Sequence, residues 1–276
     1  MNYYKIKKEQ ERATKIRENF TLPQELIKIF NNSPQKGIES FFDAVNEYLN
    51  QFNLRKNLKI ADFGAGTGLI GQYIYKKIKN KGHHSTTYFI DLNKKYLDFI
   101  PNNKNFKKIN KNLFDINYKE KFDIGLISSV LHHFNKEGAL NVFKKIKNSL
   151  KKNGILVCGC FISSSKRSQK LLEDAFKLID NLIGAPNFRY FPTEQEFYDA
   201  LQTLGFNEIT LFKKINEPIT TKRWIERNNL NEDQANILNY FLKHATEKDH
   251  NYLENSMLKI IISAKKEETK CPKNLK

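Results

Sequence analysis

An acid followed by three glycines at two-residue spacing is the part of this sequence best suited to hold a ligand. The stretch reads Asp62-Phe-Gly64-Ala-Gly66-Thr-Gly68, with a strand-like apolar run before it and a helical apolar pattern after it. Because glycine has no Cβ and tolerates positive φ, the backbone of such a loop can approach a ligand closely, and the N–H groups that open the following helix add hydrogen-bond donors. We therefore predict a cofactor-binding loop between a strand and a helix.

The spacing of these glycines is compatible with two classes of cofactor, a dinucleotide or a ligand that carries a cation. Residues 66–71 also fit G-x-G-x-x-G, the fingerprint of dinucleotide-binding loops. Asp62 favours a different ligand, because a carboxylate just before the loop repels a pyrophosphate and attracts a cation such as an ammonium group. A glycine-rich turn whose acid only caps the helix is the alternative without a ligand.

A second acid, Asp91, ends the next strand-like run, residues 86–91. It follows the loop by about 20 residues, the offset at which an acid hydrogen-bonds a ribose in nucleotide-binding α/β units. A carboxylate can accept hydrogen bonds from both ribose hydroxyls at once. We predict a ribose contact for Asp91, with a strand-end acid that caps the next helix as the alternative.

These residues need a scaffold that brings strand ends together, and the chain has the elements for one. Strand-like and helical segments alternate from residue 58 to 161, the order typical of a parallel sheet with helices on both faces. In such a sheet ligands bind at the carboxyl ends of the strands, where the glycine loop and Asp91 both lie. The seven expected strands are residues 58–63, 86–91, 106–109, 122–128, 155–161, 206–213 and 256–265.

A second motif lies around the fourth expected strand. Residues 122–134 read F-D-x-x-x-x-x-x-V-L-H-H-F and are followed by a helical pattern, Asn153-Gly154 and an apolar strand. Together with the glycine motif, this succession resembles the class I S-adenosylmethionine-dependent methyltransferases, especially those of quinone biosynthesis and other small-molecule methyltransferases. The resemblance covers about residues 58–161. It disfavours the alternative that the glycine loop binds a dinucleotide.

The resemblance implies an α/β fold. It is a Rossmann-like seven-stranded, mostly parallel sheet with an antiparallel last strand, helices on both faces, extra N-terminal helices and helical insertions. We expect a helical cap at residues 1–55, the cofactor-binding methyltransferase domain at 56–266 and a polar tail at 267–276. The insertions fall at about residues 166–192 and 217–255.

The resemblance also assigns roles to individual residues. Asp62 faces the amino group of S-adenosyl-L-methionine and Asp91 binds its ribose. Asn112 receives the adenine amino group, with Asp115 as a rival, and the reaction releases S-adenosyl-L-homocysteine. The expected cofactor-binding residues are Asp62, Gly64, Ala65, Gly66, Gly68, Asp91, Leu92, Asn112, Leu113 and Ser128.

His132 is the candidate catalytic residue, because it follows the fourth strand and resembles the histidine base of some O-methyltransferases. The sulfonium activates the methyl group, so the protein has to align a nucleophile for in-line displacement and remove a proton where the acceptor carries one. A structural role for His132 and its neighbour His133 is the alternative. We expect no metal, because no acidic pair follows the fourth strand as in catechol-type enzymes.

The charge and composition limit the kinds of partner and compartment that we expect. The sequence has 47 Lys and Arg against 30 Asp and Glu, a formal net charge of +17. Such a charge is typical of proteins that bind nucleic acids. The charge is mostly lysine spread along the whole chain, so we favour a solvated surface. No apolar run is long enough for a membrane span, and three cysteines give neither a disulfide framework nor a metal-ligand set. We expect a cytoplasmic monomer or homodimer.

The expected function is methyl transfer to the O, C or N of a small molecule. An RNA or protein methyltransferase is the second hypothesis, supported by the positive charge. Against it, Ser128-Ser129 stand where amino-directed nucleic-acid methyltransferases carry an Asn/Asp-Pro-Pro-aromatic motif. A partner protein that binds the cofactor without catalysis is the third.

Overall fold

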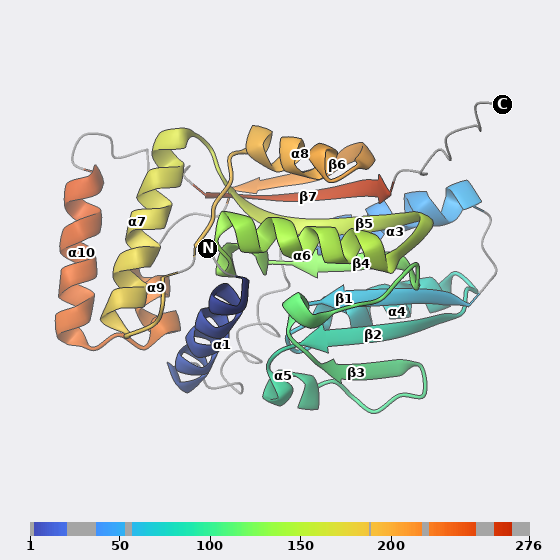
Figure 1. Ribbon diagram of the computed structural model, residues 1–276, viewed down its shortest axis with the longest axis horizontal. Helices are drawn as coiled ribbons and strands as arrows, with labels where there is room; N and C mark the ends of the chain where they lie inside the picture. Colours follow the sequence, from blue (N-terminus) through green and yellow to red (C-terminus); the bar gives the residue numbers. More distant parts are fainter. Residues whose placement is uncertain are drawn as a thin grey trace.

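The core of the protein is one seven-stranded sheet. The computed structural model describes residues 3–20, 37–52, 57–187, 189–216, 221–246 and 257–266. The strand order is β3-β2-β1-β4-β5-β7-β6 (Figure 1). The strands are β1 (Leu58–Phe63), β2 (Ser85–Asp91), β3 (Phe106–Asn110), β4 (Phe122–Ser128), β5 (Leu150–Ser163), β6 (Phe206–Asn216) and β7 (Met257–Lys266). Strands β1 to β5 pair in parallel, and β7 pairs antiparallel with both β5 and β6. The expected Rossmann-like fold with an antiparallel last strand is confirmed.

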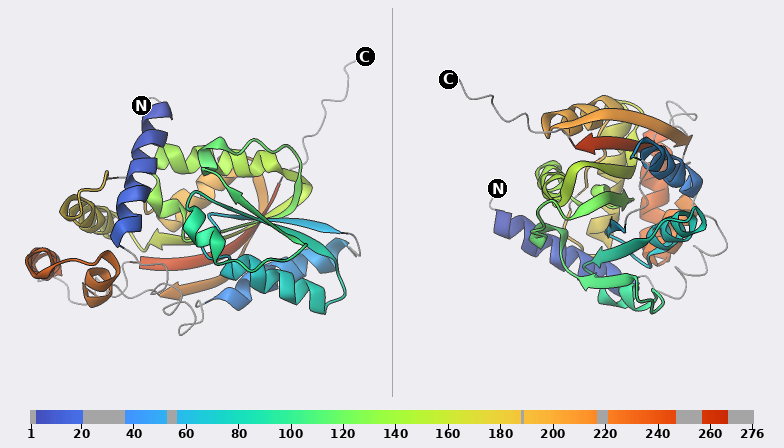
Figure 2. Two further views of the ribbon diagram at one scale, coloured as in Figure 1. Left: turned by 90° about the horizontal axis from the view of Figure 1, so that it is seen from below. Right: turned by 90° about the vertical axis from the view of Figure 1, so that its right-hand side faces the viewer.

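Helices cover both faces of the sheet. Figure 2 shows α3 and α4 on one face and α6 on the other. The helices are α1 (Tyr3–Phe20), α3 (Ile38–Phe52), α4 (Leu69–Asn80), α5 (Lys94–Asp98), α6 (Lys136–Ser149), α7 (Lys166–Leu182), α8 (Glu194–Thr203), α9 (Thr221–Asn228) and α10 (Glu232–Thr246). Two 3₁₀ turns, η1 (Leu113–Asp115) and η2 (Leu131–His133), follow β3 and β4.

The strands alternate their apolar side chains between the two layers, as the two-residue period of a strand requires. In β1, Ile60 packs with α3 and α4, while Phe63 packs in the cluster that contains α6 and α8 residues. In β5, Val157 packs in the same cluster as Ile60, and Cys158 packs in the same cluster as Phe63. Both faces are therefore closed, and the loops at the carboxyl ends of the strands are left for binding.

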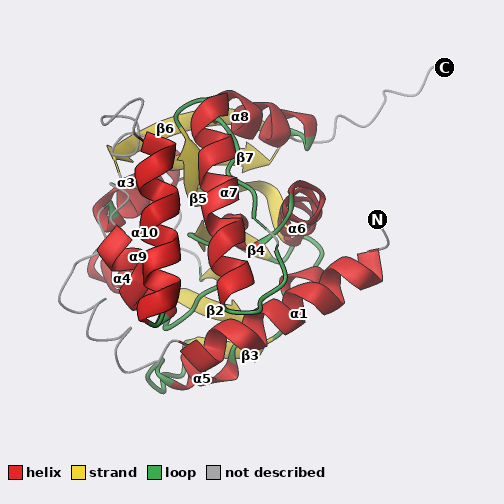
Figure 3. Ribbon diagram, turned by 90° about the vertical axis from the view of Figure 1, so that its left-hand side faces the viewer, coloured by secondary structure: helices red, strands yellow, loops and turns green. Residues whose placement is uncertain are grey.

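A third apolar cluster lies beyond the sheet, in the two expected insertions. Helix α7 packs on α10, and α10 on α9. Their shared core includes Leu172, Ile179, Phe191, Trp224 and Leu238. In Figures 1 and 3 these helices and α1 gather at the end of the sheet where the parallel strands finish.

The structure differs from the expected elements at the start of the fifth strand. Asn153-Gly154 does not form a separate turn before a strand. It lies within β5, where Asn153 has φ 58 and the pairing with β4 shifts register, so the dipeptide forms an irregularity inside a longer strand. The expected cap at residues 1–55 includes α1, in which Ile6 and Ala13 are buried. Residues 21–36 of that cap lie outside the described residues.

Candidate functional site

The glycine loop joins β1 to α4 at the point where the strand order reverses between β1 and β4, the usual ligand crevice of such sheets. Gly64, Gly66 and Gly68 all have positive φ, at 70°, 53° and 76°. A Cβ at Gly64 would overlap the side chain of Val130, and one at Gly68 would overlap Ile100. At Gly66, no heavy atom of the described residues lies within 4 Å of the Cβ position. Two glycines therefore serve close packing, and Gly66 faces open space.

Asp62 lies beneath this loop and is 3% exposed. Its Oδ2 accepts a hydrogen bond from the backbone N–H of Gly71 at 3.0 Å, in the first turn of α4. Burial raises the pKa of Asp62 to about 7, the charge of Asp91 adds to the rise, and the Gly71 N–H opposes it. An acid that ionises near neutrality at a buried position stabilises a bound cation strongly.

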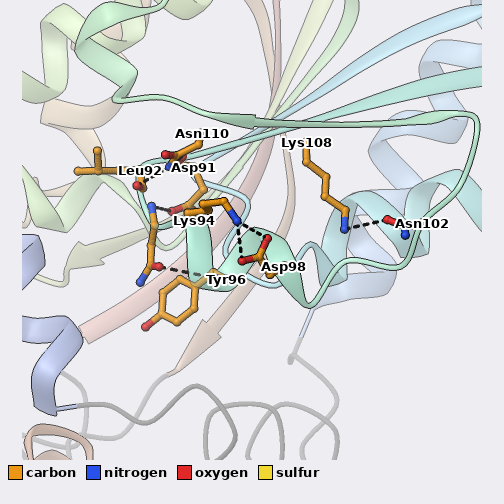
Figure 4. Close-up of polar contacts among 9 residues, drawn as sticks. Asp91, Leu92, Lys94, Tyr96, Asp98, Asn102, Lys108 and Asn110 are labelled. Carbon is orange, nitrogen blue, oxygen red and sulfur yellow. Dashed lines mark hydrogen bonds and ion pairs between the residues drawn. The ribbon is translucent and has the colours of Figure 1, made fainter.

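Asp91 closes the other side of the loop. Its Oδ2 accepts from the Gly66 N–H at 2.7 Å, and its Oδ1 accepts from the Asn93 N–H at 2.8 Å. Burial raises the pKa of Asp91, and these N–H donors oppose the rise. The Asn110 side chain donates to the carbonyl oxygens of Leu92 and Asp91, at 2.6 and 3.1 Å, which holds this turn against β3 (Figure 4).

Asn112 caps η1, and each polar atom of its side chain has a partner. Its Oδ1 accepts from the Phe114 N–H at 3.0 Å, and its Nδ2 donates to Oε1 of Glu11 at 3.3 Å. The neighbouring Asp115 forms an ion pair with Lys7 at 2.8 Å. Helix α1 thus meets η1 through two polar contacts. The sequence reasoning missed Lys7 and Glu11, because nothing in a charged N-terminal helix indicates where it docks.

Leu113 is 6% exposed and belongs to the main core. Ser128 ends β4, and its Oγ is buried without a hydrogen-bond partner among the described residues. A Cβ at Gly159 would meet both this Oγ and the ring of Phe41. The next residue, Ser129, has φ 55 and donates its N–H to the Gly159 carbonyl at 2.8 Å. The chain therefore turns sharply out of β4 into η2.

The histidine pair follows this turn, and the two rings have different surroundings. His132 is 5% exposed and lies among aromatic rings, with centroid distances of 4.1 Å to His133, 5.2 Å to Phe161 and 5.9 Å to Phe191. His133 is half-buried, and its Nδ1 lies 3.0 Å from NH1 of Arg189. Sequence reasoning missed Arg189, which is 56 residues away and lies in the first expected helical insertion, after α7.

Among the described residues, no group of three or more His, Cys, Asp and Glu side chains could hold a metal ion. None of the described helices has the length and apolar character to span a bilayer. A surface hollow lined by Asn102, Lys104 and Lys108 lies beside β3. Figure 4 shows Asn102 and Lys108 well away from Asp91 and Leu92, so this hollow is separate from the glycine loop.

Comparisons with known proteins agree with this fold. Residues 61–156 match the family model described as a methyltransferase domain. No curated protein sequence matches the chain. The YcgJ protein from Bacillus subtilis aligns with a TM-score of 0.64 and 15% identity over 83% of this chain and 99% of its own. A structure described as a putative methyltransferase from Bacillus halodurans aligns with a TM-score of 0.62 and 15% identity. The alignment covers 82% of this chain and 100% of that structure.

A third similar structure contains a ligand. It is a phosphoethanolamine N-methyltransferase from Haemonchus contortus in complex with phosphomonomethylethanolamine and S-adenosylhomocysteine. It aligns with a TM-score of 0.51 and 13% identity over 81% of this chain and 53% of its own. The matched domain spans β1, the glycine loop, β2 and β4, the elements that carry the two acids and the histidine pair. Residues 61–156 therefore match a methyltransferase domain, and the chain shares the fold of these structures.

Proposed function

We propose that this enzyme transfers the methyl group of S-adenosylmethionine to the O, N or C of a small molecule by in-line displacement. The observation that carries the proposal is the arrangement of one buried acid and one partly buried acid on either side of a glycine that faces open space. Asp62 lies under the loop, Asp91 holds the Gly66 N–H, and Gly66 leaves room for a ligand. The cofactor, when bound, supplies a methyl group already activated by its sulfonium.

The residues present fit that cofactor. The ionised Asp62 pairs with its ammonium group, and burial makes this pairing stronger than it would be in water. Asp91 accepts from the ribose hydroxyls, and Asn112 with Leu113 receives the adenine, with Asp115 as the second polar candidate. The remaining contacts come from Gly64, Ala65, Gly66, Gly68, Leu92 and Ser128.

Helix α1 is the part of the expected N-terminal cap that covers this end of the site. Glu11 contacts Asn112 and Lys7 contacts Asp115, so α1 lies directly over the proposed adenine position. Helix α3, by contrast, packs its buried face against the sheet and α4. We infer that α1 acts as the cap and that α3 is part of the methyltransferase domain.

A small-molecule acceptor suits the position of the helical insertions. Helices α1, α7, α9 and α10 lie at the end of the sheet where the parallel strands finish (Figure 3). Such an enclosure restricts the size of the acceptor. His132 is the proposed general base, since it follows β4 beside the loop. The buried thiols of Cys158 and Cys160 are free, which supports a reducing compartment such as the cytoplasm.

The test has two measurements. Calorimetry should show binding of S-adenosylmethionine and no binding of NAD(H), and Asp62→Asn should weaken the binding. Asp98→Asn, on the exposed side of α5, is the matched control for Asp62→Asn. Methyl transfer from labelled cofactor is then measured into a metabolite extract, into total RNA and into total protein. Label in the metabolite fraction supports the proposal. Label confined to RNA or protein, or no transfer at all, rejects it.

A further inference from the structure

A buried ion pair stands behind the histidine turn. Arg189 and Asp180 form two parallel contacts, Nε to Oδ2 at 3.0 Å and NH2 to Oδ1 at 2.9 Å. Their side chains are 5% and 0% exposed. The Arg189 guanidinium also lies over the ring of Phe176, with 4.9 Å from Cζ to the ring centre. Bidentate geometry and ring stacking hold this guanidinium in one orientation.

The third nitrogen of the guanidinium, NH1, is 3.0 Å from Nδ1 of His133. A guanidinium has only donors, so this contact is a hydrogen bond only if Nδ1 accepts. The neutral imidazole then carries its proton on Nε2. This is the reverse of the usual arrangement at a catalytic histidine, where a carboxylate accepts from Nδ1–H and leaves Nε2 unprotonated as the base.

The position of His133 makes its second nitrogen relevant to the acceptor. It ends η2, and Val130, just before η2, packs directly against Gly64 of the cofactor loop. The imidazole is half-buried, and its Nε2 lies across the ring from the contact with Arg189. A donor is therefore held beside the crevice by Arg189, which Asp180 orients in turn.

We propose that the Asp180–Arg189 pair fixes His133 as the Nε2–H tautomer, which makes His133 a hydrogen-bond donor to an oxygen or nitrogen lone pair of the methyl acceptor. The acceptor class is a molecule with a carbonyl, hydroxyl or carboxylate at this point, in preference to an ammonium group. His133 is thereby removed as a general base, and Asp180 and Arg189 are positioning residues. The acceptor role rests on the proposed function, whereas the tautomer does not.

Nitrogen NMR of the protein labelled with ¹⁵N-histidine tests the tautomer directly. Spectra are recorded on the protein saturated with S-adenosylhomocysteine, above the ordinary histidine titration range. The His133 signals are identified by their loss in His133→Gln. His244 serves as the internal reference, because its Nδ1 lies 2.9 Å from the Tyr240 carbonyl, which can only accept.

We expect a protonated Nε2 and an unprotonated Nδ1 at His133, opposite to His244. In Arg189→Lys, which keeps the positive charge but lacks the planar fork, His133 should become a mixture of tautomers. A protonated Nδ1 at His133 in the wild type overturns the proposal. So does a single Nε2–H tautomer that persists in Arg189→Lys.

The donor role is tested by methyl transfer into the metabolite extract. His133→Gln keeps a side-chain donor and an acceptor for Arg189, and should retain activity within a few-fold, whereas His133→Phe should lose about tenfold or more. Both should bind S-adenosylhomocysteine like the wild type, which shows that they are folded. Wild-type activity in His133→Phe overturns the donor role. Absence of transfer by the wild type rejects the proposed function, and the NMR result still decides the tautomer.

Discussion

The Asp62 carboxylate and the Gly71 N–H are joined by a 3.0 Å hydrogen bond that ties β1 to the first turn of α4. A Cβ at Gly71 would lie 2.8 Å from that carboxylate oxygen, so the close approach needs a glycine. The contact holds a buried acid whose pKa is about 7. Without a cation beside it, the ionised form of Asp62 therefore lowers the stability of the fold.

The first prediction concerns the stability of the free protein. The pKa of Asp62 rises from 3.8 to about 7 on folding, so its ionisation costs stability as the pH rises between these values. The full cost above neutrality is ~4 kcal/mol, as an upper bound. Asp62→Asn removes it and keeps an acceptor for Gly71, so the variant should be more stable than the wild type at alkaline pH. Denaturant unfolding measures this, with the exposed Asp98→Asn as control.

In acid, the same variant should have wild-type stability, because Asp62 is then protonated in both folded and unfolded states. A variant less stable than the wild type at alkaline pH would contradict the assignment of a destabilising charge.

The second prediction is the pH dependence of cofactor binding. The affinity for S-adenosylhomocysteine should rise with pH up to about 7, as Asp62 ionises, by up to tenfold per unit. It should fall again above about 8, where an α-amino group loses its proton. Calorimetry in buffers of different ionisation enthalpy measures affinity and proton release together. Asp62→Asn should lose the acidic limb of this profile, and an unchanged limb would rule out Asp62 as its cause.

The third prediction distinguishes two effects of alanine at Gly66, the strain of the backbone and the loss of space for the ligand. Gly66 and Gly82 both have positive φ, and neither has a described heavy atom within 4 Å of its Cβ position. Alanine at either site should cost about 1–2 kcal/mol of unfolding free energy through strain alone. Gly66→Ala should also weaken S-adenosylhomocysteine binding by at least about tenfold, because the methyl group occupies ligand space. Equal affinities in the two variants would place the ligand elsewhere.

The fourth prediction tests α1 as a cap over the adenine. Lys7→Ala removes the 2.8 Å ion pair with Asp115. Because the pair is partly exposed, it contributes about 0.2–1 kcal/mol, so the affinity for S-adenosylhomocysteine should fall by no more than about fivefold. The loss should shrink at high salt. Lys94→Ala removes a more exposed ion pair, with Asp98 on α5, and is the control. A change in affinity no larger than that of the control would remove α1 from the site.

The fifth prediction concerns His132. If it is the general base, His132→Ala should lower kcat by on the order of 10² or more, while the affinity for S-adenosylmethionine stays near wild type. The measurement uses the acceptor fraction identified by labelled methyl transfer. His84→Ala, at an exposed position before β2, is the control. A decrease below tenfold would leave alignment of the acceptor as the main contribution of the protein.

Much of the fold was readable from local patterns. The apolar periods located the seven strands. The glycine motif and its acid indicated a strand, loop and helix, which the structure confirms. These features are decided within a few residues, by backbone sterics and by the period of burial, so a single sequence contains them.

The spacing of Asp62, Gly66 and Asp91 predicted that the two acids flank the loop, because parallel strands end at one edge of the sheet. Only the tertiary structure showed that Asp91 holds the Gly66 N–H, that α1 reaches Asn112 and Asp115, and that Arg189 and Asp180 support His133. These contacts join residues that lie from 9 to more than 101 positions apart in the sequence. Charged side chains on helix surfaces have no period that identifies a partner, so their pairing is decided when the apolar faces pack and bring them together.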